Sequence, residues 1–173
     1  MSKLTAAYIA GFIDGEGYFG ILKNRCRTGG RREDYYTAVL KIGNTDKDII
    51  YWLKNSFGGT IWIRDADDTH KTVYQWTLET KKLVPFIDKI YPYLKIKKKQ
   101  AELLRELRKT ININSYHFPT REAKNGGKFV SKTLNVDIVK KREELYEEIR
   151  KLNKRGNSLH AERLNKETSE RMM

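Results

Sequence analysis

The chain has 173 residues, the length of a single domain with a short tail. Lys and Arg number 35 against 22 Asp and Glu, which gives a formal net charge of +13 at pH 7. A charge excess of this size favours nucleic acid or another anionic surface as the partner. Hydrophobic residues make up 39% and aromatic residues 11% of the chain, which excludes a disordered basic protein.

Cys26 is the single cysteine, so an internal disulfide is excluded and a reducing, intracellular setting is expected. No apolar stretch of the sequence is long enough to cross a bilayer, so no membrane partner is expected. The apolar run 6–13 is too short and too interrupted for a signal peptide. His70, His117 and His160 are too scattered along the chain to indicate a zinc site with the cysteine.

Hydrophobic spacing and glycine stops predict the elements in chain order. They are a helix over 5–13, strands over 18–23 and 35–42, a helix over 46–57, strands over 60–64 and 72–78, and helices over 82–94, 98–111 and 138–152. Segment 112–135 is expected to be an irregular connection. We place one domain at 1–153 and a polar tail at 154–173.

Three element ends have clear local signals. Ser2 or Thr5 can cap the first helix, and Asp14 to Gly17 are expected to end it, since two glycines in four residues favour a turn. Gly58 and its glycine neighbour stop the second helix, and Asp137 is expected to cap the last one.

This order of elements predicts an α+β fold with one antiparallel sheet and with helices on one of its faces. The two strand pairs are separated by turn-rich loops, which is typical of hairpins. No predicted helix remains to cover the second face of the sheet. That face is therefore expected to meet water or a ligand.

Small residues and one acid share a face of the first helix. Their spacing of i, i+3, i+4, i+7 and i+8 places them together; they are Ala7, Ala10, Gly11, Asp14 and Gly15. A smooth stripe lets a second helix approach closely. Its partner is either another helix of the same chain or a second copy of this one. No other segment offers a matching small-residue face, so we favour a homodimer.

Residues 9–17, Ile-Ala-Gly-Phe-Ile-Asp-Gly-Glu-Gly, resemble the nine-residue signature of the LAGLIDADG homing endonucleases. The helix-strand-strand-helix-strand-strand-helix order that follows, and the lysine-rich segment 93–100, are also similar to this family. The resemblance covers roughly residues 4 to 153. It implies an αββαββα fold in which an antiparallel, saddle-shaped sheet binds the major groove of DNA. It also implies homodimers for chains with one signature, so double-stranded DNA and a second copy are the expected partners, and no other protein partner is implied.

The resemblance implies specific roles at the end of the signature. Glu16 matches the acid that binds a divalent metal, and Gly15 matches a position whose carbonyl also contacts the metal. We expect Mg²⁺, with Mn²⁺ as a substitute and with Ca²⁺ supporting binding without cleavage. Lys97 matches a lysine near the scissile phosphate, where it would stabilise negative charge. Asn44 and Lys47 match positions that orient water or supply a basic group.

Two of these residues also have simpler readings. Glu16 is alternatively a solvated acid at a helix end, although a carboxylate there opposes the helix dipole. Lys97 is alternatively one solvated lysine among four in five positions. Asp14 is interpreted as a structural cap or hydrogen-bonding residue.

Strand alternation separates the side chains that face the helices from those that face outward. If Phe19 and Ile21 face inward, the outward set can contact bases and phosphates. On the strands this set is Tyr18, Leu22, Asn24, Thr37, Val39, Lys41, Trp62, Arg64, Gln75 and Thr77, and around the first hairpin loop it is Arg25, Arg27, Arg31 and Arg32. The arginines are expected to contact phosphates rather than read sequence.

The sequence therefore predicts a homodimeric, metal-dependent endonuclease that cuts both strands of a long, nearly palindromic DNA site, of the kind used in intron homing. The alternative is a nucleic-acid binder that does not cleave, such as an RNA-splicing maturase with the same fold. A basic structural protein is excluded as an explanation of a small-residue helix that ends in an acid.

Overall fold

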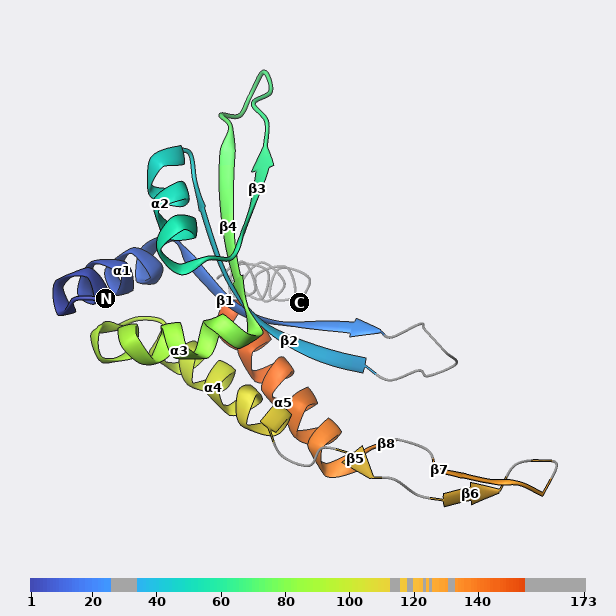
Figure 1. The fold of residues 1–173 in the computed structure, drawn as a ribbon. Helices are drawn as coiled ribbons and strands as arrows, with labels where there is room; N and C mark the ends of the chain where they lie inside the picture. Colours follow the sequence, from blue (N-terminus) through green and yellow to red (C-terminus); the bar gives the residue numbers. More distant parts are fainter. Residues whose placement is uncertain are drawn as a thin grey trace, which may run out of the picture.

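The computed structural model describes residues 1–25, 34–112, 116–117, 120–122, 124, 126–130 and 133–154. In chain order the elements are α1 (Lys3–Glu16), β1 (Gly17–Arg25), β2 (Asp34–Asn44), α2 (Lys47–Phe57), β3 (Thr60–Arg64), β4 (Val73–Glu79), α3 (Thr80–Ile90), the short 3₁₀ helix η1 (Tyr91–Tyr93), α4 (Lys98–Asn112), β5 (Tyr116–His117), β6 (Thr120–Glu122), β7 (Lys128–Val130), β8 (Thr133–Leu134) and α5 (Val136–Asn153). Figure 1 shows their arrangement.

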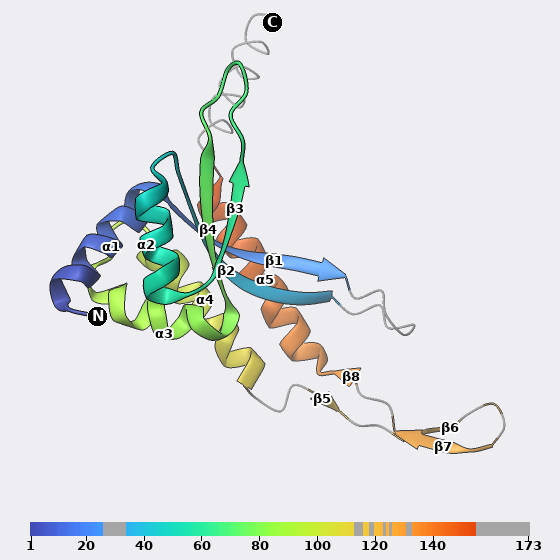
Figure 2. The ribbon, with the colours of Figure 1, turned by 45° about the horizontal axis from the view of Figure 1, so that its top comes forward.

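The main sheet has four antiparallel strands in the order β1-β2-β4-β3. The β1–β2 and β3–β4 hairpins diverge from each other, while the helices gather on one face of the sheet (Figure 1). The turned view in Figure 2 shows the same separation of helices and hairpins. This arrangement confirms the predicted α+β fold with a sheet that is covered by helices on one face.

The core lies between the sheet and the helices. Phe19, Leu40 and Trp76 project from three different strands and are fully buried. Trp76 satisfies its indole N–H by donating to the carbonyl oxygen of Gly58, at a distance of 2.7 Å. A buried indole usually needs such a partner, because an unpaired donor in an apolar core costs free energy. The helices thus close over a continuous apolar layer.

The first helix extends further than the sequence predicts. α1 continues through Asp14 and Glu16, and it ends where the N–H of Gly17 donates to the carbonyl of Ile13. The helix thus ends within the predicted segment 14–17, at its last glycine and not at its start. Gly15 keeps a helical conformation, since a single glycine weakens a helix without ending it. Ser2 is the N-cap, and its hydroxyl accepts from the N–H of Thr5.

Two further boundaries differ from the predictions. The connection between α4 and α5 contains two short antiparallel ladders, β5–β8 and β6–β7, where an irregular segment was expected. The second ladder extends away from the body of the fold (Figure 2). The cap of α5 is Asn135, whose side chain accepts from the N–H of Asp137, so Asp137 lies in the first turn instead of capping it. None of the helices in the described ranges is long and apolar enough to span a membrane.

Candidate active site

Glu16 is the last residue of α1, and its side chain is exposed. The next residue, Gly17, begins β1 and pairs with Ile42 of β2, so the acid lies at the root of the main sheet. This position follows from the local sequence, because the helix-terminating bond to Gly17 leaves no spacer between the helix and the strand. The acid predicted to bind metal is thus accessible where the helix meets the sheet.

Lys97 contacts the same end of α1. Its ammonium donates to the carbonyl oxygens of Ile13 at 2.9 Å and of Asp14 at 2.6 Å. Burial lowers the pKa of Lys97, while the nearby negative charges of Asp14 and Glu16 act in the opposite direction. The structure therefore brings Glu16 and Lys97, which are far apart in sequence, to one end of one helix.

Asp14 is a hydrogen-bond acceptor at this junction. The backbone N–H groups of Lys95 and Lys97 donate to its two carboxylate oxygens, at 2.7 and 2.9 Å. Burial raises the pKa of Asp14, but the hydrogen bonds from the backbone of residues 95–97 outweigh it, and the net pKa is lowered. This agrees with the structural role expected for Asp14, and Asp14 is not a second exposed acid beside Glu16.

The donor set at the end of α1 fits a metal that keeps part of its water shell. In the part of the chain that the structure describes, no three His, Cys, Asp or Glu side chains are placed to share a metal ion. One copy thus offers the Glu16 carboxylate and nearby backbone carbonyls. Mg²⁺ is commonly held by one or two carboxylates together with phosphate oxygens and water, so a site completed by DNA suits these residues.

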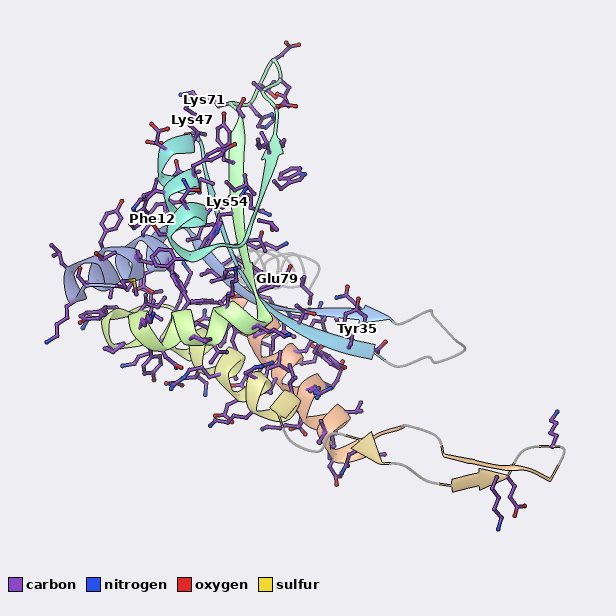
Figure 3. The ribbon with its side chains drawn as sticks, viewed as in Figure 1. Phe12, Tyr35, Lys47, Lys54, Lys71 and Glu79 are labelled. Atoms are coloured by element: carbon purple, nitrogen blue, oxygen red, sulfur yellow. The ribbon has the colours of Figure 1, made fainter. Side chains whose placement is uncertain are left out.

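Asn44 and Lys47 lie at and just beyond the end of β2 that pairs with the start of β1. Asn44 is the last residue of β2, and its side-chain oxygen accepts from the N–H of Asp46 at 2.8 Å. Lys47 begins α2 and is exposed (Figure 3). Because Ile42 pairs with Gly17, Asn44 lies only two residues beyond the strand position next to Glu16. Their catalytic roles stay predictions.

A stripe of small residues on α1 is open. Ala7, Gly11 and Gly15 are exposed, and a Cβ added at either glycine would meet no described atom within 4 Å apart from the nearby backbone of α1 itself. Ala10, by contrast, is fully buried. Its prediction as an interface residue is wrong, because the helix turns Ala10 toward the core of its own chain. The remaining stripe could accept a second helix.

Apolar side chains border this stripe. Leu4 and Tyr8 are exposed, and the rings of Tyr8 and Phe12 stack with centroids 6.3 Å apart. Figure 3 shows Phe12 on α1 beside α2. Trp52 of α2 makes an edge contact with the Tyr8 ring. The small-residue stripe thus continues into an apolar surface that α1 and α2 share.

The strand register places the predicted DNA-contacting residues on one face of the sheet. Paired residues of antiparallel strands share a face, and the row Tyr18–Lys41–Thr77–Thr60 crosses all four strands. The same register assigns the other predicted positions to this outer face. They are Leu22, Asn24, Thr37, Trp62, Arg64 and Gln75, and all are exposed or partly exposed.

Val39 is the exception on this face. It pairs with Gly20 and with Glu79, which puts it on the outer side, but its side chain is fully buried. Its prediction as a groove-contacting residue is therefore wrong. The ring of Tyr18 folds back over Gly20 and fills the space that a side chain at Gly20 would need, so this aromatic residue covers that part of the face.

Some predicted contacts cannot be placed. Arg27, Arg31 and Arg32 lie outside the described residues, as do Cys26 and the chain from 155 onward. Arg25 ends β1, and only its backbone is described.

Sequence reasoning missed the contacts between residues 13–14 and 95–97 that join the two halves of the site. The bonded residues are 81 to 84 positions apart, and each hydrogen bond involves at least one backbone atom. Backbone groups carry no sequence signature, so no local pattern indicates this junction.

Comparison with known proteins identifies the fold and the family. The family model described as "LAGLIDADG endonuclease" matches residues 9–107. The structure resembles that of the homing endonuclease I-CvuI in complex with the I-CreI target, with a TM-score of 0.65, 17% identity, and coverage of 88% of this chain and 84% of that one. It also resembles the archaeal intron-encoded homing endonuclease I-Vdi141I complexed with DNA, with a TM-score of 0.65, 20% identity, and coverage of 88% and 86%.

A third similar structure is the homing endonuclease I-TnaI, with a TM-score of 0.58, 20% identity, and coverage of 85% of this chain and 94% of that one. No curated protein matches the sequence. The family model extends from the start of the signature, at Ile9, through Lys97 and into α4, and it covers more than half of the chain. The chain belongs to the LAGLIDADG endonuclease family.

Proposed function

We propose that the chain is a site-specific, double-strand DNA endonuclease that acts as a homodimer with a divalent metal. The observation that carries this proposal is the exposed Glu16 carboxylate at the end of α1, with the Lys97 ammonium beside it and an open small-residue stripe along the same helix. A second copy packed on that stripe would bring two such carboxylates together. Two sites are what cleavage of both DNA strands requires.

In this proposal the Glu16 carboxylate and the carbonyl of Gly15 hold Mg²⁺. Bound there, the metal would supply Lewis-acid stabilisation of the phosphate and help to activate water for attack. The DNA-bound structures of I-CvuI, determined in the presence of Mg or Ca, support a divalent metal in this fold. Mn²⁺ would replace Mg²⁺, and Ca²⁺ would support binding without cleavage.

The residues of the chain itself bind and orient the DNA. The outer face of the sheet holds the duplex, with Lys41 and Arg64 on phosphates or guanine edges and with Asn24 and Gln75 suited to adenine. Lys97 stabilises negative charge that develops at the phosphate. Because its ammonium is already fixed by two carbonyls, little reorganisation is needed when the charge appears.

The test uses Glu16→Gln, which keeps the size of the side chain and removes the charge that holds the metal. A target is first selected by cleavage of a randomised DNA library with the wild-type protein and Mg²⁺. The variant should bind this target as well as the wild type does, or more tightly, because a negative charge near the phosphates is gone. Its cleavage should fall by several orders of magnitude.

Binding is measured by gel shift in Ca²⁺, and chemistry by a nicking assay in Mg²⁺. Glu79→Gln is the matched control, because Glu79 is an exposed acid and is the last residue of β4 (Figure 3). It should affect binding in the same direction and leave the cleavage rate unchanged. Wild-type cleavage by Glu16→Gln would show that the metal lies elsewhere. A wild-type protein that cuts no duplex and promotes splicing of an intron RNA would replace the endonuclease with the maturase alternative.

A further inference from the structure

We infer that Asp14 is a positioning residue for DNA cleavage: it locks the end of α1 against the start of α4 and so fixes Glu16 and Lys97 relative to each other. The inference rests on the proposed function for its effect on the reaction. The lock itself is a set of contacts within one chain, and it can be tested without cleavage.

The first half of the lock joins Asp14 to the segment that leads into α4. Its two carboxylate oxygens each accept one backbone N–H, from Lys95 and from Lys97. The N–H of Ala101 donates to the carbonyl of Lys97, so Lys97 stands immediately before the first turn of α4. The bonded N–H groups lie just before the helix and not within its first turn. That turn has no acidic residue of its own, and Asp14 of α1 places a negative charge beside it, which the helix dipole favours.

The second half is the cap that Lys97 provides for α1. The last carbonyls of a helix lack intrahelical partners and favour a cation. α1 carries no basic residue in its last turn, and the Lys97 ammonium donates to the carbonyls of Ile13 and Asp14. Each helix thus lacks the charge that its end favours, and each receives it from the other. The two sets of contacts are reciprocal.

This reciprocity has a consequence for the reaction. Glu16 follows Asp14 by two residues, so the same lock that places α4 also places the metal-binding carboxylate. An ammonium has three donors, and Lys97 uses two of them on α1, which leaves one to reach a phosphate oxygen. Catalysis is sensitive to such placement, since a displacement of about 1 Å can cost about 100-fold in rate.

The experiment compares Asp14→Asn with Asp46→Asn in the full-length protein. Asp46 is a matched control because its carboxylate also accepts two backbone N–H groups, from Asp48 and Ile49, but at the start of α2. Asparagine keeps one acceptor oxygen and loses the charge. Three quantities are measured for each variant. They are the single-turnover cleavage rate in Mg²⁺ at saturating DNA, the Kd for DNA in Ca²⁺, and the melting temperature.

We expect Asp14→Asn to lower the single-turnover rate by about 10- to 100-fold, as removal of partners that orient metal ligands typically does. Its Kd for DNA should stay at the wild-type value. Asp46→Asn should lower the melting temperature and leave the rate unchanged. A wild-type rate for Asp14→Asn would overturn the inference, and so would an equal loss of rate in both variants.

Two additions keep the inference testable in every case. If Asp14→Asn does not fold, Asp14→Glu keeps the charge but displaces it by one methylene, and it should show the same loss of rate with an unchanged Kd. Amide hydrogen exchange at Lys95 and Lys97, measured without DNA, should accelerate in the Asp14 variant and not in the Asp46 variant. Unchanged protection would overturn the lock even if the wild type cleaves no DNA, so its failure is distinguishable from failure of the proposed function.

Discussion

Gly17 occupies a position where a side chain has no room. A Cβ added there would lie 2.7 Å from the carbonyl oxygen and 2.8 Å from Cγ2 of Ile13, one turn back in α1. The carbonyl is also the acceptor of the helix-ending bond from Gly17, so it cannot move away without breaking that bond. The final glycine of the signature is therefore required by packing, at the residue that joins the helix to the strand.

Gly17→Ala should accordingly destabilise the fold by about 1–3 kcal/mol, the usual cost of overpacking. Gly43→Ala is the control, because a Cβ there meets Val73 at 3.7 Å, an ordinary contact in the same sheet. It should be neutral or slightly stabilising, since alanine loses less backbone entropy than glycine on folding. Urea denaturation of the two variants measures the difference. Equal stability of the two variants would show that α1 adjusts to the added methyl group.

At the scale of elements, α5 is joined to the β1–β2 hairpin by one carboxylate. Glu143 accepts from the ammonium of Lys23 at 2.7 Å and from the hydroxyl of Tyr36. Lys23 also pairs with Asp34 on β2, at 3.4 Å. Farther along α5, the side chain of Asn153 donates to the carbonyl of Phe19 at 2.8 Å. The hairpin that carries half of the outer face is thus fixed from behind by the last helix.

These contacts predict an acid-sensitive attachment. The hydrogen bonds from Lys23 and then Tyr36 hold the pKa of Glu143 below its ordinary value of 4.5. A carboxylate with a lowered pKa stabilises the fold fully above its unfolded pKa, and this contribution is lost as pH falls through the lower folded value. Thermal unfolding between pH 6 and 3 should therefore show a drop below about pH 4.5 that is smaller in Glu143→Gln.

Glu147→Gln is the control for this titration. Glu147 pairs with Arg150 of the same helix, at 3.1 Å, and makes no ion pair with the described residues of the hairpin. Its variant should keep the wild-type pH dependence. If Glu143→Gln and Glu147→Gln titrate alike, the Glu143 contacts do not hold α5 to the sheet. At the alkaline end, burial and then the bond to Glu143 raise the pKa of Tyr36 from 10 to about 12. Its contribution to stability is therefore fully present below pH 10 and is lost as the pH rises through about 12.

For the whole molecule, the open stripe on α1 predicts self-association. Gly11→Leu should push two helices apart, because the stripe depends on backbones that approach closely. Lys109→Leu is the control, since it adds the same side chain at an exposed position of α4, where Lys109 is paired with Glu106. Sedimentation should show a dimer for the wild type and the control, and a monomer for Gly11→Leu. A dimer in all three would place the interface elsewhere.

Two basic residues of the outer face, Lys41 and Arg64, predict salt-sensitive binding. Each phosphate contact contributes a log–log slope of about −0.9 in affinity against salt. Replacing Lys41 and Arg64 with Ala should make the slope shallower by about the contribution of two phosphate contacts. Arg150→Ala, which removes a charge already paired with Glu147 on α5, should leave the slope unchanged. Equal slopes for the double variant and the wild type would remove these two residues from the interface.

The local sequence determined much of this protein. Hydrophobic spacing and glycine stops predicted every helix and strand of the main fold, since these signals act within a few residues. The split of strand residues into two faces followed from alternation, which the backbone geometry of a strand imposes. Glu16 could be singled out because residues 9–17 resemble the family signature, and a nine-residue signature is also a local pattern.

Only the tertiary structure decided what surrounds those residues. Spacing shows which side of an element is apolar, but not which neighbour covers it, and so it could not tell that Ala10 and Val39 are fully buried. The bonds of Asp14 to the backbone at 95–97, and of Glu143 to Lys23 across 120 residues, form when distant elements pack together. Such contacts depend on the path of the whole chain, which no local pattern contains.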